Sequence, residues 1–208
     1  MISAPEALAR LRAGNRRFVE GLRDADSVGY TPRVAPGQVQ QPFAIILGCS
    51  DSRVPAELVF GQGFGDLFVI RVAGNVVAPS QVGSVEFAAA RFGTRLVVVL
   101  GHTECGAITA TVEELRRPTL DQSPGLRAIV DRIRPAVAPL LDTPLAGESE
   151  TLMAHAVRAN IRAAADQLRH GSSVLEGLVQ RDGLAIIGAE YCLGTGMVDF
   201  FDGAPLSA

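Results

Sequence analysis

Four short aliphatic runs punctuate the chain and predict the strands of a sheet. They read FAIIL (43–47), LFVIRV (67–72), RLVVVL (95–100) and LAIIGAE (184–190), and each is mostly continuous in apolar character rather than alternating. Strands that are covered on both faces show this pattern, which is typical of parallel sheets. We therefore expect four parallel strands in the interior of the protein.

Segments with helical spacing separate these runs. They cover residues 55–60, residues 80–93 and a long region from about 105 to 181, and a further helix is predicted at the N-terminus, opened by Ser3-Ala4-Pro5-Glu6. Residues 32–42 read as a loop before the first core strand, and residues 139–150 read as an exposed connection. The alternation of strands and helices predicts an α/β fold with a central, mainly parallel sheet flanked by helices.

The size of the chain favours one hydrophobic core. It has 208 residues, of which 48% are hydrophobic, and this is long enough for one good core and short for two. We expect a single domain over residues 1–208, in which residues 1–35 form an N-terminal helical arm and a loop.

Charge and cysteine usage narrow the classes of partner. The net charge is −3 and the basic residues are scattered, which argues against nucleic acid or an anionic membrane as the main partner. No apolar run approaches the roughly 20 residues needed to span a bilayer, and the N-terminus lacks the apolar core of a secretory signal. The three cysteines are an odd number and suit metal binding or catalysis in a reducing compartment better than a disulfide framework. We expect a cytoplasmic protein that acts on a small molecule.

Reactive side chains follow two of the predicted strands. GCSDSR (48–53) leaves the first strand, and GHTECG (101–106) leaves the third. Loops at the carboxyl ends of parallel strands share one edge of the sheet, where ligands bind. His102 and Cys105 are three apart at the start of a helix, so they can face one centre and meet Cys49 if the two strands are neighbours. Two thiolates and an imidazole, with an oxygen as fourth ligand, suit zinc rather than magnesium or calcium.

Each motif alone has a plainer interpretation. A cysteine at a strand end is more often a core residue than a ligand, and a Gly-His pair after a strand is commonly a turn. Packing does not easily explain both motifs at equivalent strand ends. A purely structural zinc usually has four Cys or His ligands, and only three are visible here. Cys192, in EYCLGTG, is a further candidate ligand, although a buried or loop thiol is the favoured reading.

GCSDSRVPAE and GHTECGAI resemble the two zinc-binding signatures of the β-class carbonic anhydrases, and the similarity extends through GNRRF, LFVIRVAGN, SVEFA and LAIIGAEY. The resemblance implies one Zn²⁺ per subunit, held by Cys49, His102 and Cys105, with Asp51 and Arg53 as a catalytic pair. It also implies reversible hydration of CO2 to bicarbonate and a proton, and a homodimer or homotetramer with active sites near the subunit boundary.

The residue types at the site are chemically consistent with that reaction. Zinc lowers the pKa of bound water to about 7, which makes hydroxide available to attack CO2. Two thiolates weaken this effect, and Asp51 can offset part of the loss by orienting the hydroxide while Arg53 keeps the carboxylate ionised. Released from Arg53, Asp51 could instead become the fourth zinc ligand and close the site.

We expect the open state at neutral pH. Some members of the family have a closed form, and a subset of these has a bicarbonate site that involves a Trp, an Arg and a Tyr. This chain has no Trp, and Ile46 stands at that position, although Arg71 and Tyr191 resemble the other two residues.

Two further residues are candidates for substrate binding. Gln40, nine residues before Cys49, matches a family glutamine that donates to bound substrate or bicarbonate, and it can act across a subunit interface. The backbone N–H of Gly106 is available to a bicarbonate oxygen at a helix start, unless the glycine serves close packing.

Two alternative functions remain: hydrolysis of carbonyl sulfide or carbon disulfide, known for this fold and ligand set, and a non-catalytic zinc protein.

Overall fold

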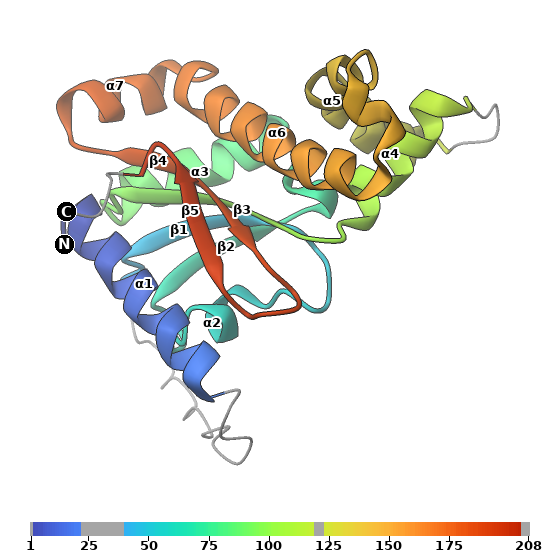
Figure 1. Ribbon diagram of the computed structural model, residues 1–208. Coiled ribbons are helices and arrows are strands. Elements are labelled where there is room, and N and C mark those ends of the chain that lie inside the picture. Colours follow the sequence, from blue (N-terminus) through green and yellow to red (C-terminus); the bar gives the residue numbers. More distant parts are fainter. Residues whose placement is uncertain (1, 22–39, 119–122, 205–208) are drawn as a thin grey trace.

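A five-stranded sheet forms the centre of the protein. The computed structural model describes residues 2–21, 40–118 and 123–204, and its sheet has the order β2-β1-β3-β4-β5 (Figure 1). Four strands run parallel and the last is antiparallel to its neighbour, so the predicted mainly parallel sheet is confirmed. The strands are β1 (Ala44–Gly48), β2 (Leu67–Arg71), β3 (Leu96–His102), β4 (Ala185–Tyr191) and β5 (Val198–Asp202).

Helices fill most of the remaining described chain, and none of them is both long and apolar enough to cross a membrane. Serine caps begin two of them: Ser123 accepts from the N–H of Leu126, and Ser172 accepts from the N–H of Leu175. The α-helices are α1 (Ala4–Gly21), α2 (Ala56–Val59), α3 (Pro79–Arg91), α4 (Gly106–Arg116), α5 (Pro124–Leu141), α6 (Ser149–His170) and α7 (Ser173–Arg181), and the 3-10 turns are η1 (Ala73–Asn75) and η2 (Pro144–Gly147).

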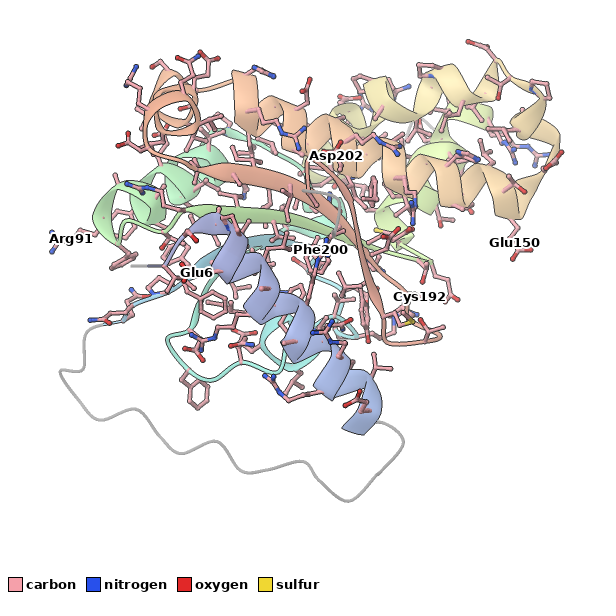
Figure 2. All side chains as sticks on the ribbon, turned by 60° about the vertical axis from the view of Figure 1, so that its left-hand side comes forward. Glu6, Arg91, Glu150, Cys192, Phe200 and Asp202 are labelled. Carbon is pink, nitrogen blue, oxygen red and sulfur yellow. The ribbon has the colours of Figure 1, made fainter. Side chains whose placement is uncertain are left out.

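The central strands are buried on both sides, as their continuous apolar runs require. Ile45 and Leu47 of β1 belong to the apolar cluster with α3, α4, α5, α6 and α7, whereas Ile46 faces the second cluster with α1 and α2 (Figure 1). Leu8 and Leu11 of α1 are buried in that second cluster, where α1 runs across the sheet (Figure 2). The N-terminal helix therefore packs on the sheet of its own chain.

The structure adds one strand that the apolar pattern did not predict. β5, with the sequence VDFFD, has acidic residues among its aromatic ones and lies at the edge of the sheet, so it lacks a continuous apolar run. Where the structure describes it, the long helical region after Cys105 divides into the α-helices α4, α5, α6 and α7. The connection predicted at 139–150 includes the end of α5 and η2. Most of the loop predicted at 32–42 lies outside the described residues.

The strand register places three loops side by side at one edge of the sheet. β1 lies between β2 and β3, and Gly48 pairs with Arg71 on one side and with Leu100 on the other. The segments that follow these strands start with Cys49, Val72 and Thr103. The ligand prediction required the two motif-bearing strands to be neighbours, and β1 and β3 are paired. η1 follows β2 at the same edge.

Candidate metal centre

Three buried side chains converge where β1 and β3 end. Cys49 directly follows β1, His102 is the last residue of β3, and Cys105 is the N-cap of α4. One candidate ligand atom from each lies within 4.8 Å of the other two, and no other such group of His, Cys, Asp or Glu exists in the described part of the chain. The structure therefore brings together the three residues that the sequence predicted as metal ligands.

The imidazole of His102 is oriented for metal binding. Its Nδ1 lies 2.8 Å from the carbonyl oxygen of Thr103, and a carbonyl can only accept, so Nδ1 carries the proton and Nε2 presents a lone pair. Nε2 is fully buried and has no hydrogen-bond partner among the described residues. A buried nitrogen normally has a hydrogen-bond partner, and one that lacks a partner beside two thiols can donate its lone pair to a metal instead. The donor set of one imidazole and two sulfurs fits zinc.

A strained turn carries His102 into Cys105. Glu104, between them, has a φ of 58°, a left-handed conformation that non-glycine residues seldom adopt. The turn is held from β4: the N–H of Thr103 donates to the carbonyl of Tyr191 at 3.0 Å, and its hydroxyl accepts from the N–H of Leu193 at 3.1 Å. These bonds fix the spacing of the two ligands.

The loop that carries Cys49 is held by groups to which the sequence assigned no such role. The N–H of Gly74, in η1, donates to Sγ of Cys49 at 3.3 Å. Arg71, at the end of β2, donates through Nε to the carbonyl of Cys49 at 3.0 Å and through a guanidinium nitrogen to that of Asp51 at 2.5 Å. The segment LFVIRVAGN contains both residues, but their backbone partners depend on the strand register.

The two thiols interact directly. Hydrogen bonding from the Cys105 thiol lowers the pKa of Cys49, and the same contact, together with burial, raises the pKa of Cys105. One thiolate is thus favoured even before a cation is present, and a divalent ion would favour the second because metal ligation requires deprotonated sulfur.

Asp51 and Arg53 form a tight pair beside the cluster. The backbone N–H and Nε of Arg53 donate to Oδ1 of Asp51, and a guanidinium nitrogen donates to Oδ2, each at 2.9 Å. These bonds hold the pKa of Asp51 far below its usual range. Oδ2 of Asp51 also lies 3.8 Å from Nε2 of His102, so the ionised carboxylate borders the ligand cluster.

The other candidate residues are not members of the ligand cluster. Gln40 precedes β1, at the opposite edge of the sheet, where it lines a surface cavity of about 500 Å³ with Arg10 and Arg91. Gly106 opens α4, and a Cβ there would meet no described atom within 4 Å, so close packing does not require the glycine. Cys192 follows β4, where Figure 2 labels it, and is not part of the ligand cluster.

Comparisons with known proteins agree with this geometry. Residues 44–198 match the family model described as carbonic anhydrase. A carbonic anhydrase of Mycolicibacterium smegmatis is 39% identical over 189 residues, which cover 91% of this chain and 89% of the relative. Carbonic anhydrase 2 of Mycobacterium tuberculosis is 36% identical over 188 residues, which cover 89% of this chain and 87% of the relative.

Solved structures of the same family have the same fold. The β-carbonic anhydrase CafA of Aspergillus fumigatus superposes with a TM-score of 0.67 at 25% identity, covering 97% of this chain and 92% of that one. A β-carbonic anhydrase of Sordaria macrospora, described as tetrameric, gives a TM-score of 0.67 at 21% identity, covering 78% of this chain and 82% of that one. With the family model spanning most of the chain and these relatives nearly full length, the chain belongs to the β-class carbonic anhydrase family of enzymes.

Proposed function

We propose that the protein binds one Zn²⁺ through Cys49, His102 and Cys105 and catalyses the reversible hydration of CO2 to bicarbonate and a proton. The observation that carries the proposal is the buried, unpartnered Nε2 of His102, in a cluster where one ligand atom from each of His102, Cys49 and Cys105 lies within 4.8 Å of the other two. Three protein ligands leave a fourth tetrahedral position for water, as catalytic zinc sites do. When bound, zinc acidifies that water so that hydroxide is available near neutral pH.

In this proposal, Asp51 orients the attacking water and Arg53 holds Asp51. An ionised carboxylate next to the ligand cluster accepts a hydrogen bond from the attacking water and directs the lone pair of the oxygen toward the carbon of CO2. Arg53 donates to both oxygens of Asp51, which keeps the carboxylate charged and paired with the guanidinium. The pair thus supports a catalytic site over a closed, purely structural one.

Gly106 and Gln40 complete the proposed substrate site. Gly106 is the first residue of α4, a position at which the backbone N–H has no partner within the helix and suits an anion such as bicarbonate. Gln40 is too far along the sheet to reach the cluster of its own chain, so we assign it to the site of a second subunit. The functional unit is then a homodimer or a homotetramer, and reduced thiolate ligands suit a cytoplasmic location.

Stopped-flow CO2 hydration, with zinc content measured on each sample, tests the proposal. The wild type should carry one zinc per chain and hydrate CO2 well above background. Asp51→Ala should keep its zinc and lose most of its rate, because it removes the orienting carboxylate but no ligand. One zinc per chain with no hydration up to about pH 9 would overturn the proposal, and carbonyl sulfide and carbon disulfide would then be the substrates to try.

A further inference from the structure

A buried amide on α6 reaches the loop that contacts the sulfur of Cys49. Asn160 is 3% exposed and is the one polar side chain among the buried residues of α6, a helix that the structure describes in full. Its Nδ2 donates to the carbonyl of Gly74 at 2.8 Å, across 86 positions of sequence. Burying an amide among apolar side chains is costly unless it is hydrogen-bonded, so this contact determines how α6 and η1 meet.

The backbone N–H and the backbone carbonyl of Gly74 are both hydrogen-bonded. Its N–H donates to Sγ of Cys49, and its carbonyl accepts from Asn160, so the two bonds together restrain the φ and ψ of one residue. Gly74 has a φ of 65°, in the left-handed region that glycine adopts without strain. Glycine is also the most flexible residue, so the direction of its N–H depends on anchors for the next peptide group. There are two of these: the amide of Asn160, and the N–H of Asn75, which donates to the carbonyl of Val72 at 3.0 Å.

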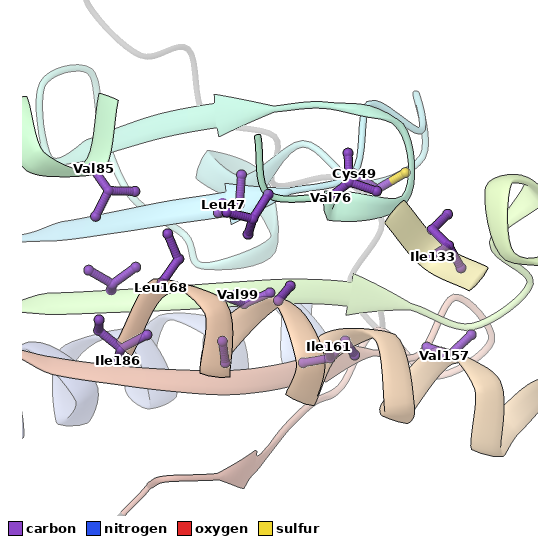
Figure 3. Close-up of a cluster of buried hydrophobic side chains, with 14 of the residues drawn as sticks. Leu47, Cys49, Val76, Val85, Val99, Ile133, Val157, Ile161, Leu168 and Ile186 are labelled. Carbon is purple, nitrogen blue, oxygen red and sulfur yellow. The ribbon is translucent and has the colours of Figure 1, made fainter. Parts of the chain in front are cut away.

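The neighbouring residue of α6 touches the other ligand-bearing segment. Ile161 packs on Gly101, which directly precedes His102, so closely that a Cβ at Gly101 would lie 2.5 Å from Cδ1 of Ile161. Figure 3 shows Ile161 on α6 in the apolar cluster that also contains Cys49. α6 therefore supports both halves of the ligand cluster, one through a hydrogen bond and one through packing.

We propose that Asn160 is a positioning residue for the metal ligand Cys49, acting through the peptide groups of Gly74. Its bond to the Gly74 carbonyl keeps the Gly74 N–H directed at the sulfur. An N–H donor to a ligating sulfur stabilises the deprotonated form that metal binding requires and holds the sulfur in place for the cation. This role rests on the proposed zinc site and adds to it the residue that tunes one of its thiolates.

The test compares Asn160→Ala with Asn15→Ala. Asn15 is a matched control because it is 6% exposed and its amide donates to the carbonyls of Val59 and Gly196, outside the ligand cluster. Both variants lose buried hydrogen bonds, so both should be less stable. Only Asn160→Ala should release zinc to a chelator about 10-fold faster or more, and only it should shift the sulfur-to-metal charge-transfer band of the cobalt-substituted protein.

The outcomes separate this proposal from the zinc proposal itself. A wild type that binds no zinc overturns the zinc site. A wild type that binds zinc, with the same release rate and the same cobalt spectrum in Asn160→Ala, leaves the zinc site standing and overturns the role of Asn160. If Asn160→Ala does not fold, Asn160→Leu carries the test, because it keeps a side chain of similar size but has no polar hydrogen to donate to the Gly74 carbonyl. The expected release rate and spectral shift are then the same.

Discussion

Oδ2 of Asp51 lies 3.8 Å from Nε2 of His102 although both oxygens of the carboxylate are bound by Arg53. In the proposed zinc site, the carboxylate therefore has two possible partners: the guanidinium of Arg53 and the cation bound by the three ligands. Under that proposal, whether Asp51 orients water or binds the cation depends on how firmly Arg53 holds it.

The first prediction concerns Arg53→Ala. With its partner removed, Asp51 should become the fourth ligand and exclude water, so kcat/KM for CO2 hydration at neutral pH should fall by about 100-fold. Zinc content should not fall, and the cobalt-substituted variant should show an altered visible spectrum. The kcat/KM of Arg53→Lys should lie between those of the wild type and Arg53→Ala, because lysine keeps the charge but lacks the planar fork of donors.

Arg116→Ala is the control for that experiment. Arg116 is an exposed arginine that donates to the carbonyl of Ala146, so its loss should leave rate and spectrum unchanged. If Arg53→Ala hydrates CO2 as fast as Arg116→Ala does, Arg53 does not control Asp51.

The second prediction separates Cys105 from Cys192. Cys105→Ser should lose its bound zinc, whereas Cys192→Ser should keep one zinc per chain, because Cys192 is outside the ligand cluster. Chelation should lower the unfolding temperature of the wild type and of Cys192→Ser, but not that of Cys105→Ser. Free zinc at 100 times its Kd should stabilise a binding-competent chain by about 2.7 kcal/mol. Zinc retained by Cys105→Ser but lost from Cys192→Ser would reverse the assignment.

The third prediction contrasts two glycines. Gly74→Ala should lower the free energy of unfolding by about 1–3 kcal/mol, because φ is positive and the new Cβ would lie 2.8 Å from Cδ1 of Ile133 and 3.0 Å from Cβ of Ala107. It should also release zinc faster, since the N–H donor to Cys49 moves. Gly83→Ala, on the exposed face of α3 with no atom within 4 Å, should stabilise by about 0.5–1 kcal/mol. Urea unfolding of both variants checks the sign of each change.

The four parallel strands and the candidate ligands could be predicted from the sequence because their signals are local. A continuous apolar run predicts a strand buried on both faces, and a reactive residue directly after it lies at a known edge of the sheet. β5 was missed because an edge strand needs no continuous apolar run, and VDFFD has none. The positions of residues 22–39, which include most of the predicted N-terminal loop, are outside the described chain.

The hydrogen bonds that position the candidate ligands could not be predicted in the same way. The helical pattern of α6 indicates that Asn160 lies on the buried face, but not that its amide meets the carbonyl of Gly74, which depends on how the helix crosses η1. The N–H of Gly74 likewise reaches Cys49 only because β2 lies next to β1. Such bonds join positions far apart in sequence, and no periodicity encodes them.

The last prediction concerns Gln40, which is separated from Cys49 by the whole of β1. A five-residue strand spans about 16 Å, so Gln40 is out of hydrogen-bond range of the cluster in its own chain. If it completes the site of a partner subunit, Gln40→Ala homo-oligomers should hydrate CO2 more slowly, and Cys49→Ser homo-oligomers should be inactive.

Hybrids of these two variants distinguish action across subunits from action within one. In a hybrid dimer, the Gln40→Ala chain keeps its three ligands and receives an intact Gln40 from the Cys49→Ser chain, so one site is complete. Random pairing at equal amounts should then restore complete sites to roughly a quarter of all chains. Stopped-flow rates on the co-refolded mixture, compared with the mean of the two unmixed samples, give the answer. A mixture no faster than that mean would place the action of Gln40 within its own subunit or outside catalysis altogether.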